Sequence, residues 1–366
     1  MMRRCSDEHL GISWYMNVGS WYDMHTSATL RDYVNLRRRF KSPVRLIMGP
    51  WTHGEEPLYR SYAGDADFGA AAMFDYNDER RRWFDQTLKG IDTGVLDDPP
   101  VKLFIMGGGT GRKRRDAPTP SLRLDHGGYW RWEHEWPLAR TRWTRFYFHP
   151  GGGLSPQPPS DTGGSTTYRF DPDNPVPTVG GALSGGPTGL GLAPGGWDQR
   201  DPRTGIPLNF RPDVLTFQTD PLPEEVEVTG PLKATLFVSS DAPDTDFTAK
   251  LIDVYPPSAD YPNGYALILA DGIIRMRYRE GYEAAKLMEP GRVYEVEIDL
   301  SATANRFMPG HRIRVDISSS NFPKYDVNPN TGEPLGRHRN RRVAHNTLHH
   351  SAAYPSHIVL PIIPAP

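Results

Sequence analysis

The chain has 366 residues, 37% of them hydrophobic and 23% charged, and a formal net charge of −2 at pH 7. This length allows one large or two smaller domains with a packed core, and the near-neutral charge gives no general attraction to nucleic acid or to an anionic membrane. The sequence contains one cysteine, no run of about 18 apolar residues and no apolar stretch near its start, which argues against an internal disulfide, a membrane span and a signal peptide. We therefore expect a cytoplasmic protein that has neither nucleic acid nor a membrane among its partners.

Residues 1–97 alternate between strand-like and helix-like segments. The short apolar runs at 12–18 and 44–48 predict buried strands. A helix is expected with Thr26 or Ser27 as its N-cap, and residues 75–89 predict a second helix. This order is typical of a parallel α/β sheet, but two strands are too few to form one. We interpret this part as the carboxy-terminal fragment of an α/β domain.

Residues 98–366 have a different, β-rich pattern. Apolar and alternating segments separated by turn residues predict strands, and two packed antiparallel sheets of the jelly-roll type are the expected fold. The Gly- and Pro-rich stretch 151–196 predicts a long surface loop. The strand-like segments are 101–106, 144–148, 215–218, 226–229, 232–238, 248–254, 292–300, 311–318 and 357–361.

Each of the first two predicted strands is followed by an ionisable residue. Asp23 follows the first strand and His53 follows the second, at the sheet edge where open α/β sheets bind their ligands. The order Asp then His matches the late part of an α/β-hydrolase triad, in which the Asp orients the imidazole and the His takes a proton from a serine. A single Asp or His at a strand end is also a common turn former, so a purely structural interpretation stays open.

The motifs around these residues resemble those of the CocE/NonD serine hydrolases. The family patterns Gly-Gly-Trp-Tyr-Asp and Gly-Pro-Trp-x-His are similar to residues 19–23 and 49–53. The resemblance implies that Asp23 is the triad acid and His53 the general base. It also implies a jelly-roll domain of the X-prolyl dipeptidyl peptidase carboxy-terminal type. Further similar segments are 82–85, 88–90, 99–101, 211–215, 239–247, 271–272, 310–315, 319–323 and 328–332.

The resemblance implies hydrolysis of ester, amide or X-prolyl peptide bonds through an acyl-enzyme, without a metal or an organic cofactor. The partners expected are therefore small-molecule esters or amides, or short peptides. Four residues near the two motifs, three aromatic residues and one histidine, are candidates for binding substrate, although packing beneath the loops is favoured for at least two of the aromatic residues and a surface-loop position for the histidine. They are Trp21, Tyr22, His25 and Trp51.

The family's nucleophile elbow, Gly-x-Ser-x-x-Gly, has no equivalent in this sequence. The nearest serines are Ser13, Ser20 and Ser184, and none has the expected strand-to-helix context. We expect the isolated, truncated chain to be inactive or nearly so, and to need a nucleophile-bearing amino-terminal half or to self-associate. The alternative is a non-catalytic β-sandwich binding or assembly module with a vestigial α/β segment.

Three other patterns have simple structural interpretations. The glycine-rich residues 107–113 lack the Gly-Lys-Ser/Thr of a phosphate loop. The four histidines within 338–350 lie in a segment that predicts loop and strand, so we expect no metal site there. The aspartates within 241–246 are favoured as turn residues over calcium ligands.

Overall fold

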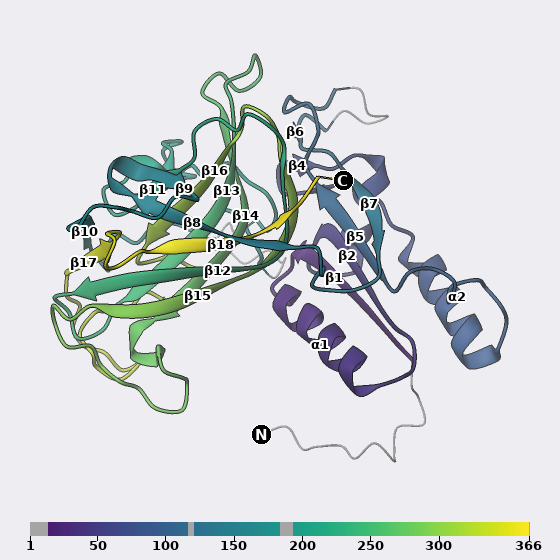
Figure 1. The fold of residues 1–366 in the computed structure, drawn as a ribbon, viewed down its shortest axis with the longest axis horizontal. Helices are drawn as coiled ribbons and strands as arrows, with labels where there is room; N and C mark the ends of the chain where they lie inside the picture. The colour runs from purple at the N-terminus through teal and green to yellow at the C-terminus, as the bar shows by residue number, and fades with distance from the viewer. Residues whose placement is uncertain (1–13, 116–120, 184–192, 366) are drawn as a thin grey trace.

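The computed structural model describes residues 14–115, 121–183 and 193–365. Figure 1 shows two parts side by side, a small one in which helices flank a sheet and a larger one made of strands. Neither described α-helix has the length and apolar character needed to cross a membrane.

The small part is built on a parallel sheet. Strand β1 (Tyr15–Tyr22) pairs with β2 (Val44–Thr52), and β2 pairs with β5 (Val101–Met106), all in parallel. β1 lies at one end of the strand order, and within the described residues only β2 pairs with it. Both early strands continue beyond the expected ends, because β1 passes through Gly19 and β2 passes through Gly49 and Pro50.

The domain boundary expected at 97/98 divides this sheet. The segment 101–106 was assigned to the β-sandwich, but as β5 it extends the parallel sheet beside β2. β7 (Gly128–Glu133) then pairs antiparallel with β5. The sequence of a single apolar strand does not indicate which strands it pairs with, because a short apolar run fits either a parallel sheet or the core of a β-sandwich.

His25 is the N-cap of helix α1 (Thr26–Arg39) and its side chain makes no capping hydrogen bond, so the expected cap at Thr26 or Ser27 is wrong. The helix packs against β1 and β2. It buries Leu30 and Tyr33 beneath the sheet, and its last turn carries three arginines. Positive side chains at a helix carboxyl end interact favourably with the helix dipole.

Helix α2 (Tyr76–Lys89) has ends that the sequence encodes directly. At its amino end the carboxylate of Asp75 accepts a hydrogen bond from the backbone N–H of Asp78 at 3.0 Å. At its carboxyl end Gly90 adopts a left-handed φ of 67°. Both are standard capping arrangements, so the helix begins and ends within one residue of the prediction.

Of the remaining strands, β8 to β18 form the larger part, and β3, β4 and β6 form a separate three-stranded sheet in which β3 contacts β2. The remaining strands are β3 (Tyr62–Ala63), β4 (Ala66–Asp67), β6 (Leu124–Asp125), β8 (Arg142–His149), β9 (Gly153–Ser155), β10 (Ser165–Phe170), β11 (Leu215–Gln218), β12 (Val226–Ser240), β13 (Asp246–Tyr255), β14 (Tyr265–Arg275), β15 (Tyr294–Phe307), β16 (Arg312–Ser318), β17 (Ala344–His349) and β18 (His357–Ile363). Short 3-10 helices span Glu56–Tyr59, Ala70–Ala72, Pro150–Gly152, Leu208–Phe210 and Met276–Tyr278.

The larger part is two layers of mostly antiparallel strands. Neighbours follow the order β15-β12-β18-β8-β9-β11-β16-β13-β14, and β14 returns to contact β15. Figure 1 shows β12, β15 and β18 in one layer, with β13, β14 and β16 in the other. Residues 294–300 of β15 alternate between buried and exposed, as expected for a strand with one face on the core.

The two parts share one hydrophobic core. A single cluster of buried side chains extends from Tyr22 and Leu46 in the parallel sheet to Leu267 and Ile298 in the β-rich part. The hydroxyl of Tyr22 also donates a hydrogen bond to the carbonyl of Ile268 at 3.0 Å, which ties β1 directly to β14.

Candidate active site

Strand register brings Asp23 and His53 together. β1 and β2 run parallel, and Tyr22 pairs with Thr52 at their carboxyl ends. The next residue along each strand is therefore Asp23 or His53, so the two side chains start from adjacent positions on one sheet edge. A turn holds this edge in place, because the hydroxyl of Thr26 lies 2.6 Å from the carbonyl oxygens of both Ser20 and Asp23.

The two side chains are hydrogen-bonded. Nδ1 of His53 lies 3.1 Å from Oδ2 and 3.2 Å from Oδ1 of Asp23. An ionised carboxylate can only accept, so Nδ1 carries the hydrogen and Nε2 keeps a free lone pair. The Asp23 side chain is 13% exposed and that of His53 is 43% exposed. The acid is thus sheltered, while the imidazole can reach a reacting group.

His25 lies beside this pair. Its backbone N–H donates to Oδ1 of Asp23 at 2.8 Å, and its ring centroid is 5.2 Å from that of His53. Ligand atoms of Asp23, His25 and His53 all lie within 4.8 Å of one another, and in the described part of the chain this is the one group of three such residues that could hold a metal ion.

The serines considered as nucleophiles do not complete a triad in the described residues. Ser20 is buried in β1 and 3% exposed, and within the described ranges no serine, threonine or cysteine side chain hydrogen-bonds to His53. Ser13 and Ser184 lie outside the residues that the structure describes.

Three of the four expected substrate-binding residues lie in the core. Trp21 is 2% exposed, and Tyr22 and Trp51 are 0% exposed. The indole N–H groups of the two tryptophans donate to the carbonyls of Phe104 and Ala72, at 2.8 and 2.7 Å. Burial of these large rings beneath the strand ends, with their polar atoms satisfied, keeps them away from a pocket mouth. Of the four, only His25 is exposed.

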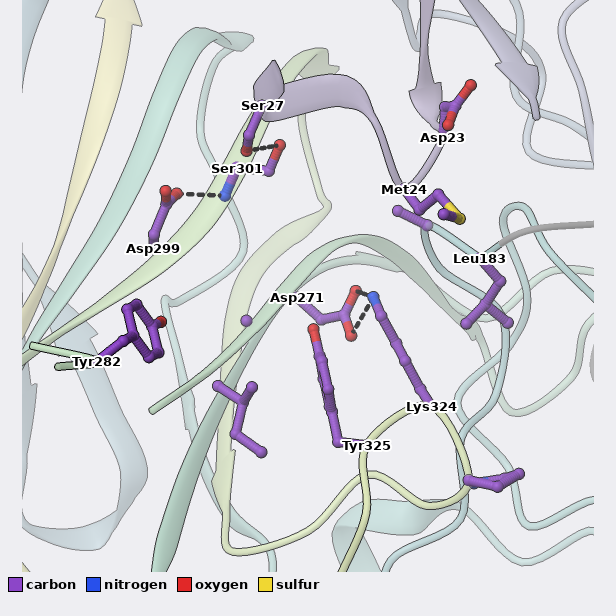
Figure 2. Close-up of a pocket in the computed structure, with 14 residues that line it drawn as sticks. Asp23, Met24, Ser27, Leu183, Asp271, Tyr282, Asp299, Ser301, Lys324 and Tyr325 are labelled. Carbon is purple, nitrogen blue, oxygen red and sulfur yellow. Dashed lines mark hydrogen bonds and ion pairs between the residues drawn. The ribbon is translucent and has the colours of Figure 1, made fainter. Parts of the chain in front are cut away.

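A cavity of about 570 Å³ lies between Asp23 and the β-rich part. Met24 and Ser27 line it from the β1–α1 junction, and residues of β14, β15 and the segment 323–325 line it from the other side. Figure 2 shows Asp271 and Lys324 pointing toward each other within it. Nζ of Lys324 lies 2.7 Å from Oδ1 of Asp271.

The same cavity holds a phenol that stays protonated. Burial, together with the charges of Asp271 and Asp299, raises the pKa of Tyr325. The cavity therefore offers a hydrogen-bond donor, an ion pair and apolar surface from Met24 and Leu183.

Sequence reasoning assigned none of these β-rich residues to the site. The strand carrying Asp271, β14, was not predicted, although its apolar run 266–270 fits a buried strand. The one available signal was that residues 271–272 are among the segments similar to the family, but the resemblance assigned them no role.

Two other candidate ligand-binding motifs have structural roles. A Cβ on Gly109 would lie 2.4 Å from the carbonyl oxygen of Asp125, so this glycine-rich segment permits close backbone packing. Two of the aspartates favoured as turn residues, Asp244 and Asp246, form buried ion pairs with Arg277 and Arg275. These contacts explain the two acidic side chains without calcium.

Comparison with known proteins gives consistent matches. Residues 93–359 match the model of the X-Pro dipeptidyl-peptidase C-terminal non-catalytic domain. The chain is 40% identical over 359 residues to the cocaine esterase of Rhodococcus sp. (strain MB1 Bresler), covering 94% of this chain and 56% of that protein. The chain thus spans about half the length of this relative.

Two solved structures resemble the whole described fold. An aminopeptidase from the marine sediment archaeon Thaumarchaeota archaeon matches with a TM-score of 0.76 and 27% identity, covering 95% of this chain and 55% of the other. An α-amino acid ester hydrolase matches with a TM-score of 0.74 and 30% identity, again covering 95% and 55%. With the sequence matches, these likenesses show that the chain belongs to the CocE/NonD family of hydrolases and corresponds to its carboxy-terminal portion.

Proposed function

We propose that this chain supplies the acid and base of a serine hydrolase that cleaves ester or amide bonds in small molecules or short peptides. The observation that carries the proposal is the hydrogen bond between Asp23 and His53 at the ends of two adjacent parallel strands. This placement matches the Asp and His positions of an α/β hydrolase.

The geometry supports general base catalysis by His53. Asp23 fixes the Nδ1–H tautomer and stabilises the imidazolium that forms, so Nε2 can take the proton from a serine hydroxyl. After the serine attacks the substrate carbonyl, the same proton passes to the leaving alcohol or amine and the acyl-enzyme remains. Water then attacks the acyl-enzyme, with His53 again acting as the base.

The serine in this proposal comes from a nucleophile-bearing α/β segment that docks beside β1. Among the described residues β1 is the terminal strand of its sheet, and it offers a row of backbone groups to a further parallel strand. The Rhodococcus relative contains a stretch with no counterpart in this chain, since the match covers 56% of it. Pairing of β1 with a second copy of this chain is the competing outcome.

The cavity beside Asp23 is proposed to hold the substrate. Its volume of about 570 Å³ lies within the range usual for sites that bind small molecules. It combines apolar surface with a few polar groups, and it lies between the part carrying the acid and base and the β-rich part. The substrate would thus contact both parts of the chain.

A second candidate function is a non-catalytic binding module, and one observation favours it. The matched domain model describes a non-catalytic domain and spans 93–359. Asp23 and His53 lie outside that range. The match therefore describes the β-rich part and does not bear on whether Asp23 and His53 act as acid and base.

Complementation tests the hydrolase proposal. The chain would be mixed with the serine-bearing segment of the Rhodococcus relative, and hydrolysis of a p-nitrophenyl ester would be measured together with labelling by a fluorophosphonate. We expect activity in the mixture and little in either piece alone. Asp23→Asn and His53→Ala should each lower kcat by on the order of 10⁴-fold or more.

His345→Ala is the matched control, because His345 also pairs with an aspartate, Asp241, at 3.0 Å on an exposed surface. This variant should keep full activity. If the two pieces associate but the mixture neither reacts with the fluorophosphonate nor hydrolyses the ester, the result would favour the binding module. Activity of the isolated chain that survives His53→Ala would show that the site is assigned wrongly.

A further inference from the structure

We propose that Asp23, His25 and His53 form a binding site for a divalent transition metal such as Zn²⁺. The three side chains come from the ends of two adjacent strands, and their ligand atoms lie within 4.8 Å of one another. Metal binding concerns this chain alone and does not depend on the proposed hydrolase activity.

The spacing of the first two ligands already fits zinc. Nδ1 of His53 lies 3.1 and 3.2 Å from the two carboxylate oxygens of Asp23. Ligands about 2.0–2.1 Å from a tetrahedral zinc ion lie roughly 3.3 Å apart. A metal ion can therefore take the place of the hydrogen on Nδ1, which moves to Nε2, once the imidazole turns so that the Nδ1 lone pair faces the ion.

His25 supplies the third ligand. Its ring is exposed and meets the ring of His53 at an interplanar angle of 61°, and its backbone N–H is bonded to Asp23. Its backbone is thus tied to the carboxylate, while its imidazole has room to turn toward a metal. An exposed side chain can make this adjustment at little cost in packing.

The donor set determines the class of metal. Two neutral imidazoles and one carboxylate suit zinc, copper, nickel or cobalt, whereas calcium and magnesium prefer oxygen ligands throughout. Three protein ligands leave a fourth position for water, as in zinc sites that are not purely structural.

Two other His–Asp pairs show why His25 matters. His345 pairs with Asp241, and His311 pairs with Asp253 at 2.8 Å. Within the described residues, neither pair has a third imidazole or carboxylate close enough to complete a metal site. The chain thus contains internal controls that share the paired ligands and lack the third.

Occupation would have a functional consequence, and this clause rests on the proposed function. A metal ion on Nδ1 of His53 replaces the hydrogen bond to Asp23 and leaves the ring hydrogen on Nε2, so Nε2 has no lone pair with which to take a proton from a serine. The metal would act as an inhibitor of hydrolysis that a chelator reverses.

Titration of the purified chain with Zn²⁺ alone, followed by calorimetry, tests the binding. We expect the chain to bind one equivalent of Zn²⁺ tightly, and to show a visible absorption band when Co²⁺ replaces Zn²⁺. His25→Gln and His53→Gln should each weaken binding at least about tenfold, as even the loss of a residue that supports a metal ligand does. His345→Ala should bind like the parent, and circular dichroism would verify that each variant is folded.

Two results would overturn the site. One is an absence of stoichiometric Zn²⁺ binding by the folded parent, and the other is binding that His25→Gln leaves unchanged. Inhibition assays on the complemented hydrolase separate the two proposals. An inactive mixture that still binds one Zn²⁺ refutes the hydrolase alone, whereas an active mixture that Zn²⁺ does not inhibit refutes the inhibitory role.

Discussion

A buried lysine in the β-rich part illustrates how single residues set the pH dependence of this fold. Lys250 lies on β13 and is 3% exposed. It is paired with Asp271 on the neighbouring strand β14 and with Asp316 on the other neighbour, β16. Its Nζ donates to the side-chain oxygen of Gln199 at 3.2 Å. Burial outweighs the attraction of the carboxylates and lowers the pKa of Lys250 to about 8.

This shift predicts that stability rises with pH. Between pH 8 and the pKa of an unfolded lysine, the unfolded chain holds a proton that the folded chain has released, so raising the pH favours the folded state. Lys250→Met should raise the free energy of unfolding at pH 7 by as much as about 3 kcal/mol, and the gain should shrink toward pH 10. Urea denaturation at several pH values measures this.

Lys233→Met provides the control for this prediction. Lys233 is an exposed lysine that pairs with Glu297, and exposed pairs contribute little to stability. Its replacement should change the free energy of unfolding only slightly. If Lys250→Met is less stable than the parent at pH 7, the attraction between the lysine and the flanking carboxylates contributes more to stability than the burial of the charged lysine costs.

The candidate acid and base could be found from sequence, because each follows an apolar strand within a motif. The pocket residues could not. Packing beneath the loops was favoured over a pocket role for at least two of the aromatic candidates, and the rings of Trp21 and Trp51 do fill the space beneath the strand ends. Asp271 escaped notice because its strand was not predicted.

At the scale of elements, helix α2 is stabilised at both ends by local interactions. Asp75→Ala removes the acceptor for the N–H of Asp78 and should lower the free energy of unfolding by about 1 kcal/mol. Asp75→Asn keeps an acceptor and should remain close to the parent. Thermal unfolding followed by circular dichroism measures both, and equal losses in the two variants would contradict a capping role.

Gly90 gives a second test of the same helix. Its φ of 67° is strained for a residue with a Cβ, although a Cβ there would meet nothing within 4 Å. Gly90→Ala should therefore cost about 1 kcal/mol through backbone conformation alone. Thermal unfolding that is unchanged by Gly90→Ala would show that this turn can relax.

The ends of α2 were predictable because its caps are local, whereas several strands were not predicted. β10 and β17 pair with each other and are rich in polar residues, so no apolar run marked them. β12 was predicted as two strands because Gly230 and Pro231 interrupt it. The structure instead accommodates Pro231 at a shift in register and continues the strand.

At the scale of the molecule, the bond from Tyr22 to Ile268 joins the two parts within one core. Tyr22→Phe would leave the buried carbonyl of Ile268 without this donor, which should lower the free energy of unfolding by about 1–3 kcal/mol. Both parts should still unfold in a single transition, because their cores are continuous. Calorimetry measures the change and the cooperativity.

Tyr261→Phe is the matched control. The hydroxyl of Tyr261 is buried and has no hydrogen-bond partner in the described residues, so its removal should be neutral or stabilising. Two separate transitions in the Tyr22→Phe variant would indicate that this hydroxyl, more than the shared core, couples the parts.

The parallel pairing of β2 with β5 also limits how the protein can be dissected. The matched domain model begins at residue 93, so a fragment cut there keeps β5 but loses β2. Five of the six β5 side chains are apolar and 0% exposed in the intact fold, and the cut would leave them beside an open strand edge. The limits of a recurring sequence unit are therefore not the limits of a unit that folds by itself. Soluble expression of the β-rich part should therefore require the first 92 residues, because they include β2, which pairs with the exposed edge of β5.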